Sequence, residues 1–327
     1  DEAGSHDYQI SDDGQFAIHR WSSRSQVPQI ELVRLPSHEP VDRFPTVRNE
    51  SLAARIGELS PVREEFFQLE LPDGAVVDGW MMFPPDFDPD AGTWPLLMHV
   101  YGEPAGTTVN DRWGSASQLW HRLLAQEGYV VASIDNRGTP APKGRAWRKS
   151  VYGEIGVLAS ADQAHAVLGL IERHPWIDSE RGGIWGWSGG GSMTLNALFR
   201  YPEIYSAGIA VAFVADQRYY DTIYQERFMN TPQANPEGYR AGSPIHHAAG
   251  LEDPVLLVYG TGDDNCHYQN FEAMVNELVK QGKQFDQLAY PNRSHGIYEG
   301  AGTSLHLRKS MLRWWKQNLP PGLFLSE

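Results

Sequence analysis

Cysteine is almost absent from this sequence, since Cys266 is the only one among 327 residues. A single thiol can form no intrachain disulfide, and it cannot build a cysteine-rich metal cluster. The twelve histidines also lack the H-E-x-x-H spacing of a helical zinc site. We therefore expect neither a metal nor another cofactor.

The sequence also has fewer basic than acidic residues. Lysine and arginine total 27 against 41 acidic residues, for a net charge of -14. Such a chain repels nucleic acid and anionic membrane surfaces, and no basic run offsets the excess. No apolar run approaches the roughly 20 residues of a membrane-spanning helix. The sequence thus favours small molecules and peptides as partners, predicts no nucleic-acid partner and no membrane segment in this chain, and leaves its location open.

The residues from 94 onward alternate short apolar runs with longer amphipathic runs. The expected strands are residues 95–101, 129–135, 182–187, 207–214, 254–260 and 285–290. The expected helices are residues 115–127, 158–173, 190–200, 268–281 and 303–318. Apolar strands that alternate with helices indicate an α/β domain, with a mostly parallel central sheet and helices on both faces.

The first residues show a different sequence pattern. DYQI, FAIHRWSS and PQIELVRL read as short strands, and Asp13-Gly14 is a hairpin signal between the first two. Two short strand pairs do not make a stable domain. We therefore assign residues 1–48 to the edge of something larger and residues 49–327 to the α/β domain, which opens with a second hairpin around residues 72–74.

The segment IWGWSGGGSM places Ser188 between Gly186 and Gly190, after an apolar run and before a helical one. This is the pattern of a nucleophile elbow, in which a strained strand-to-helix turn exposes a serine hydroxyl. The N–H that follows such a serine is free to face a developing oxyanion. A glycine-rich turn that merely contains a serine is the alternative, because the bare pattern also occurs by chance.

In an α/β-hydrolase the acid and then the histidine follow the serine along the chain, after later strands. The strand at 254–260 runs into Asp263 and Asp264, and the strand at 285–290 runs into a loop that contains His295. Ordinary turn chemistry is the alternative for the two aspartates. His246 and His247 precede the acid strand, and His267 falls at the first turn of the next helix; each is expected to be structural or exposed.

Six segments carry a resemblance to a known family: GWSGGG, GTGDDNCHYQ, SHGIY, RYYDTIYQERFM, HVYGEP and IDNRGT. With these segments the chain resembles the dipeptidyl peptidase IV branch of the prolyl oligopeptidase family of serine peptidases. The resemblance implies an α/β-hydrolase fold and a catalytic triad of Ser188, Asp263 and His295, with Asp263 rather than Asp264 as the acid.

The resemblance also implies an oxyanion hole made by the Tyr101 hydroxyl and the Gly189 N–H. It implies a small apolar S1 pocket, which accepts proline at P1, the residue whose carbonyl is attacked. The substrate-binding residues that it implies are Trp187, Tyr220, Tyr224, Asn265, Val214 and Cys266. From the residues alone, Tyr101 could be a core aromatic, Tyr220 and Tyr224 one packed helix face, and Asn265 a turn residue.

Three positions depart from the family pattern: Gly189, Glu103 and Ala159, the last of which stands where relatives often have glutamate. Relatives often have tyrosine where this chain has Gly189, and the loss of that ring widens the S1 wall and argues against a strict proline preference. Glu103 stands beside the oxyanion tyrosine, where glycine is common. A carboxylate there would repel an anionic intermediate unless it points away.

The first strands resemble the last blade of a β-propeller that covers the hydrolase in this family. The resemblance therefore implies a longer protein, whose upstream propeller would supply paired glutamates for the substrate's amino terminus. It favours a periplasmic or secreted location, and it suggests a homodimer through the last helix. Core packing is the alternative use of the apolar stripe on that helix, which comprises Leu305, Leu312, Trp315 and Leu319.

The function expected from the residues and the resemblance is that of a serine-type dipeptidyl aminopeptidase, which favours proline or alanine at the penultimate position. An acylaminoacyl peptidase or an esterase would use the same triad. A non-catalytic binding module, as among the inactive relatives, is a further alternative, although such modules normally lack the serine.

Overall fold

A computed structural model describes residues 2–324 of the chain. The chain forms two units, the first comprising residues 1–62 and 110–126, and the second residues 63–109 and 127–327. The first unit thus includes residues beyond position 48. The domain boundary predicted at that position remains a proposal.

The first unit contains an antiparallel sheet of four strands in the order β1-β2-β3-β4. Its strands are β1 (Ser5–Ile10), β2 (Phe16–Ser22), β3 (Gln29–Arg34) and β4 (Glu39–Pro40). The expected turn lies between β1 and β2, where Gly14 has a φ of +68° that favours glycine. This unit also includes α1 (Glu50–Gly57) and α2 (Ser115–Gln126), of which only α2 was predicted.

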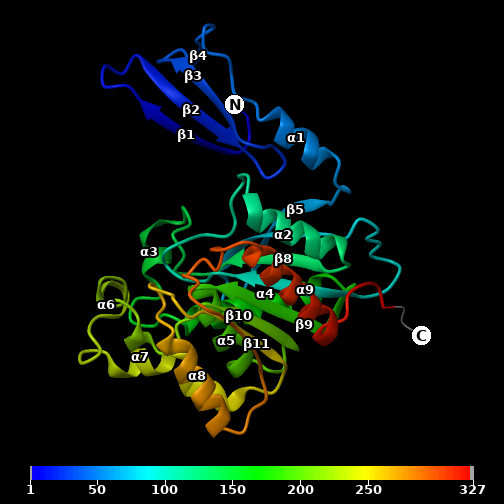
Figure 1. Cartoon of the computed structure of the whole chain (residues 1–327), viewed down its shortest axis with the longest axis vertical. Helices are drawn as coiled ribbons and strands as arrows, with labels where there is room; N and C mark the ends of the chain where they lie inside the picture. Colours follow the sequence, from blue (N-terminus) through cyan, green and yellow to red (C-terminus); the bar gives the residue numbers. More distant parts are fainter. Residues whose placement is uncertain (1, 325–327) are drawn as a thin grey trace. The chain divides into compact units, whose positions relative to one another are not determined.

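The second unit contains an eight-stranded sheet in the order β12-β11-β10-β9-β7-β8-β6-β5 (Figure 1). Its strands are β5 (Glu64–Glu70), β6 (Val76–Met82), β7 (Trp94–Val100), β8 (Val130–Asp135), β9 (Ile177–Trp187), β10 (Ala207–Val211), β11 (Val255–Gly260) and β12 (Asp286–Tyr290). All neighbouring pairs from β12 to β8 are parallel, while β6 runs antiparallel to β8 and to β5. The sheet is therefore mixed but mostly parallel, as the alternation of apolar and amphipathic runs predicts.

The helices of this unit are α3 (Gly144–Lys149), α4 (Leu158–Arg173), α5 (Gly189–Arg200), α6 (Thr222–Met229), α7 (Pro236–Gly242), α8 (Gln269–Lys280) and α9 (Thr303–Asn318). The four longest match the predicted helices. The short helices α3, α6 and α7 were not predicted, because fewer than three turns give too short a stretch for a hydrophobic period to be read. Two 3₁₀ segments, η1 (Gln217–Tyr219) and η2 (Pro244–Gly250), adjoin α6 and α7.

Helices pack on both faces of this sheet. A methyl group at Gly208 would lie 2.4 Å from Leu198 of α5, so α5 covers the face that Gly208 shares with its register partner Ile184. A methyl group at Gly183 would lie 3.0 Å from Trp315 of α9. Because successive strand residues point to opposite faces, α9 covers the other face. The prediction of helices on both faces is confirmed.

The buried face of α9 differs from the predicted stripe. Leu305 is 60% exposed, and the buried residues are Thr303, Leu307, Ser310, Met311, Trp314 and Trp315. Of the predicted stripe, Trp315 and the flanking Leu319 are buried in the core. The predicted stripe therefore overlaps the buried face at Trp315 and Leu319 and departs from it at Leu305. Dimerisation through this helix remains a proposal.

The carboxyl ends of the parallel strands β7, β9, β11 and β12 meet at one edge of the sheet, at Val100, Trp187, Gly260 and Tyr290. The loops that follow β11 and β12 are joined there by a hydrogen bond from Gly262 N to Arg293 O at 3.0 Å. Loops at this edge are the usual place for a binding or catalytic site in an open α/β sheet. Within residues 2–324, none of the helices combines the length and apolar character needed to cross a bilayer.

Candidate active site

Ser188 occupies a strained turn between β9 and α5. Its φ of 60° and ψ of -125° are rare for a residue with a side chain. The turn is tight enough to require glycine on both sides, because a methyl group at Gly190 would lie 2.1 Å from Val100 O. A methyl group at Gly186 would lie 2.3 Å from Gly190 O. The predicted strand, turn and helix are therefore all present, with Ser188 half-buried at the start of the helix.

Asp263 and His295 are brought together by the loops after β11 and β12. His295 Nδ1 lies 2.8 Å from Asp263 Oδ2, and the Asp263 side chain has no exposed surface. Since an ionised carboxylate only accepts, Nδ1–H donates and His295 Nε2 is left as an acceptor. Asp264 is exposed, so the structure pairs His295 with Asp263 and not with its neighbour.

Backbone contacts hold this pair in place. Asp263 Oδ1 accepts from the Asn265 N–H at 2.9 Å, so both carboxylate oxygens are engaged. The Trp187 indole N–H donates to His295 O at 2.9 Å, which ties the histidine loop to the end of β9. Trp187 therefore supports the loop of His295, and it is not among the residues that line the pocket described below.

The Ser188 hydroxyl lies 3.9 Å from the Cys266 thiol. Within the described residues, no hydrogen bond joins Ser188 Oγ to the His295 ring. Burial raises the pKa of Cys266 to about 12, with the nearby Asp263 adding to the effect. Cys266 is thus a neutral thiol at the serine and not a competing thiolate nucleophile.

The other candidate histidines are engaged elsewhere. His246 Nε2 lies 3.7 Å from Asp216 Oδ2, and His247 Nε2 lies 2.9 Å from Ala241 O. Burial lowers the pKa of both histidines. His267 is exposed beside α8. None of the three contacts Asp263 in the part of the chain that the structure describes.

A small pocket opens beside Ser188, with about 300 Å³ of empty space including its mouth. Its lining comprises Tyr101, Glu103, Ser188, Gly189, Val214, Gln217, Tyr220, Tyr224, Gln225 and Cys266. Burial raises the pKa of the Tyr101 hydroxyl above its ordinary value, so it remains a protonated donor. The sequence singled out most of this lining, but not Gln217 or Gln225, whose approach depends on how the segment after β10 folds.

Tyr220 and Tyr224 form one wall of this pocket. Their rings meet edge to face, with centroids 5.4 Å apart. Tyr220 has an extended backbone and precedes α6, whose N-cap is Asp221. The alternative that both tyrosines belong to one helix face is therefore wrong.

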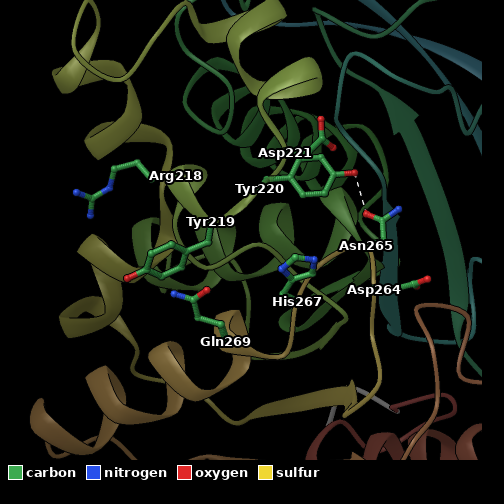
Figure 2. A pocket seen from close by; sticks show the side chains of 8 residues that line it. All are labelled: Arg218, Tyr219, Tyr220, Asp221, Asp264, Asn265, His267 and Gln269. Carbon is green, nitrogen blue, oxygen red and sulfur yellow. Dashed lines mark hydrogen bonds between the residues drawn. The ribbon is translucent and has the colours of Figure 1, made fainter.

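A more open pocket adjoins the first, and Figure 2 shows the side chains that line it. The Tyr220 hydroxyl donates to Asn265 Oδ1 at 2.8 Å, and the two side chains point toward each other in Figure 2. Tyr220 lines both pockets, so it separates them. Asn265 is exposed and lines this second, wider space.

One group in the first unit has the atoms of a metal site. The ligand atoms of His19, Glu31 and His38 lie within 4.8 Å of one another. His19 Nδ1 is 2.9 Å from Glu31 Oε1, and His38 Nε2 is 2.9 Å from the Tyr8 hydroxyl. His19 and Glu31 are thus hydrogen-bonded to each other, and His38 is hydrogen-bonded to Tyr8.

Comparison with known proteins assigns the family. The model of the prolyl oligopeptidase family matches residues 116–321. The chain belongs to the prolyl oligopeptidase family. This assignment agrees with the resemblance carried by the six sequence segments, and with it the mixed sheet described above is that of an α/β-hydrolase.

Several members of the prolyl oligopeptidase family are similar to this chain. A protein of Uncinocarpus reesii named "Probable dipeptidyl-aminopeptidase B" is 36% identical over 290 residues, which cover 87% of this chain and 31% of that protein. "Dipeptidyl peptidase 4" of Trichophyton equinum is 34% identical over 256 residues, 76% of this chain and 32% of that protein. The crystal structure of Porphyromonas gingivalis dipeptidyl peptidase 4 superposes with a TM-score of 0.92 at 36% identity, over 97% of this chain and 44% of that one. The chain spans about a third of the length of these curated relatives.

Proposed function

We propose that this chain is the catalytic part of a serine peptidase that cleaves peptide bonds through an acyl-enzyme on Ser188. The observation that carries the proposal is a strained elbow serine at the sheet edge where the half-buried His295 is hydrogen-bonded to the buried Asp263. Family membership supports the reaction class. Strain at a non-glycine residue is costly and persists where it serves a function.

In this mechanism Ser188 Oγ attacks the scissile carbonyl, and His295 Nε2 takes the hydroxyl proton. Asp263 keeps the imidazole in the tautomer that leaves Nε2 free, and it stabilises the imidazolium that forms. The tetrahedral intermediate collapses when His295 returns the proton to the leaving amine. A water molecule, deprotonated by the same nitrogen, then hydrolyses the ester on Ser188.

The negative oxygen of the intermediate is stabilised by the Tyr101 hydroxyl and the Gly189 N–H. Both residues line the pocket with Ser188. The raised pKa of Tyr101 supports a donor role, since a tyrosinate could not donate. Gly189 begins α5, whose first N–H groups have no partner within the helix and carry the positive end of its dipole.

For the whole protein we propose removal of dipeptides from free amino termini, with an upstream β-propeller as the covering domain. The support is the names of the relatives, which are dipeptidyl peptidases, and the share of their length that this chain spans. An acylaminoacyl peptidase or an esterase is the second candidate, because the same three residues would serve it. Rates with Gly-Pro-anilide, acetyl-Ala-anilide and p-nitrophenyl acetate separate the three activities.

The nucleophile is tested by labelling with a fluorophosphonate probe, which reacts with an activated serine whatever the substrate. We expect the wild-type chain to be labelled and Ser188→Ala to lose all labelling. Ser304→Ala is a matched control, because Ser304 is exposed on α9. Labelling that persists in Ser188→Ala would remove Ser188 as the nucleophile, and an unlabelled wild-type chain would favour a binding module.

A further inference from the structure

Two of the departures from the family pattern, Gly189 and Glu103, lie side by side in the structure. A methyl group at Gly189 would lie 2.2 Å from Glu103 Cγ and 3.0 Å from Glu103 Cδ. The obstacle at Gly186 and Gly190 is backbone, whereas at Gly189 it is the side chain of Glu103 alone. Gly189 also lacks a positive φ, so its backbone would accept any residue. The Glu103 side chain thus fills the space that a side chain at position 189 would take.

Glu103 is held firmly in that space. The residue is 5% exposed, and its Oε2 accepts from the Tyr224 hydroxyl at 2.8 Å. Within the described residues, no donor bonds to its second oxygen, Oε1. Glu103 nevertheless lines the pocket beside Ser188, so a group bound in that pocket can reach the carboxyl.

Within residues 2–324, no cation forms an ion pair with this carboxyl. The groups whose charges couple to Glu103 among residues 2–324 are Tyr101, Tyr220, Tyr224 and Cys266, none of which is a cation. Burial raises the pKa of Glu103 to about 7. A carboxyl that loses water when a ligand binds is costly to leave unpaired, and a ligand that supplies a donor offsets that cost.

The rest of the pocket lining includes polar side chains as well as apolar ones. Gln217 and Gln225 line it and are hydrogen-bonded to each other through their side chains. Both are buried. The tyrosine rings and Val214 supply the apolar part of the lining, and one carboxyl and two amides supply its polar part.

We infer that Glu103 is a specificity-determining residue: it replaces a side chain at position 189 as a wall of the S1 pocket, and it favours a short P1 side chain with a hydrogen-bond donor, such as serine, over proline. The inference rests on the proposed function, because it takes the pocket beside Ser188 as the S1 site. A pocket built around a hydrogen bond discriminates strongly against a substrate that lacks the matching group. The proline ring has no donor and would leave Oε1 unpaired.

The acceptor role is tested with Glu103→Leu, which keeps the bulk of the side chain and removes both oxygens. The measurement is kcat/KM for Gly-Ser-, Gly-Ala- and Gly-Pro-p-nitroanilide. We expect the ratio of the serine to the proline substrate to fall about tenfold in Glu103→Leu, the effect of one hydrogen bond to a charged group. A ratio within about twofold of wild type would overturn the inference.

The shared space is tested by a double-mutant cycle. Gly189→Tyr alone is expected to lose most of its activity, because the new ring collides with Glu103. In the double variant that combines Glu103→Gly with Gly189→Tyr, the tyrosine ring has room. We expect this variant to recover activity and to prefer the proline substrate. Additive effects of the two substitutions would show that the positions are independent. That result would overturn the inference that Glu103 takes the place of a side chain at position 189.

Fluorophosphonate labelling separates this inference from the proposed function. Consider first a wild-type chain that is labelled at Ser188, with a ratio of kcat/KM for the serine and proline substrates that is the same in Glu103→Leu as in wild type. In that case the inference about Glu103 is wrong and the proposed peptidase function is retained. If the wild-type chain is not labelled, the peptidase itself fails. A melting temperature for each variant identifies any loss of activity that reflects unfolding.

Discussion

At the scale of single residues, the candidate site depends on which neighbour in a pair points inward. Asp263 and Asp264 are adjacent in the sequence, and both favour turns. Asp263 turns into the site and bonds to His295, whereas Asp264 lies exposed beside the open pocket. The side chains of adjacent residues in a turn point in different directions. The conformation of the backbone therefore decides which of the two aspartates reaches His295.

Asp263→Asn is expected to lower kcat roughly 10⁴-fold, because the amide no longer holds the imidazole in the productive tautomer. Asp264→Asn is the matched control and should retain nearly wild-type kcat. The measurement is steady-state hydrolysis of a dipeptidyl anilide by the two variants. Equal losses would contradict the assignment of Asp263 as the acid.

Glu103 makes the stability of the fold depend on pH. Its folded pKa, about 7, lies above the ordinary 4.5, so the folded state holds the proton more tightly than the unfolded state. Its contribution is therefore present below about pH 4.5 and is lost as the pH rises to about 7. We expect the free energy of unfolding of wild type, relative to Glu103→Gln, to fall by roughly 3 kcal/mol over that window.

Urea unfolding at several pH values measures this difference, since the Gln side chain does not titrate. The charges that couple to Glu103 come from Tyr101, Tyr220, Tyr224 and Cys266, which are all neutral in this range. A pH profile that is parallel for wild type and Glu103→Gln would contradict the burial of an unbalanced carboxyl.

At the scale of elements, the junction of β9 and α5 combines catalytic and structural demands. The turn must expose Ser188 while the first turn of α5 passes against the end of β7. That close approach leaves no room for a side chain at Gly186 or Gly190. The glycines of the elbow are therefore dictated by packing between backbones, and the serine by chemistry.

Gly190→Ala is expected to destabilise the chain by about 1–3 kcal/mol or more and to reduce activity, because its methyl group would lie 2.1 Å from Val100 O. Gly57→Ala is a control, since a methyl group there meets nothing within 4 Å and the substitution stiffens the unfolded chain. Thermal unfolding of both variants measures the effect. A Gly190→Ala variant as stable as wild type would contradict the tight elbow.

At the scale of the whole molecule, the excess of negative charge decides which partners are repelled. With a net charge of -14 and no basic run, we expect no binding to duplex DNA or to vesicles that contain phosphatidylserine at 0.15 M salt. Co-sedimentation with such vesicles and gel-shift with DNA measure this. Binding to either would indicate a local basic surface that the net charge of the whole sequence does not reveal.

Much of this protein follows from its sequence alone. The apolar runs placed six strands of the larger sheet and its four longest helices, because hydrophobic periodicity is a local property of the chain. The order of Ser188, Asp263 and His295 along the chain identified the three candidate residues, since parallel strands bring their carboxyl ends to one edge. The family followed from short segments, and the family model confirms it.

Only the tertiary structure decided how distant residues share space. It pairs Asp263 with His295, leaves Trp187 out of the pocket lining, separates Tyr220 from the helix of Tyr224, and exposes Leu305 on α9. Glu103 and Gly189 looked like two unrelated departures in the sequence. In the structure the Glu103 side chain lies where a side chain at position 189 would begin, because packing brings together atoms from segments far apart in the chain.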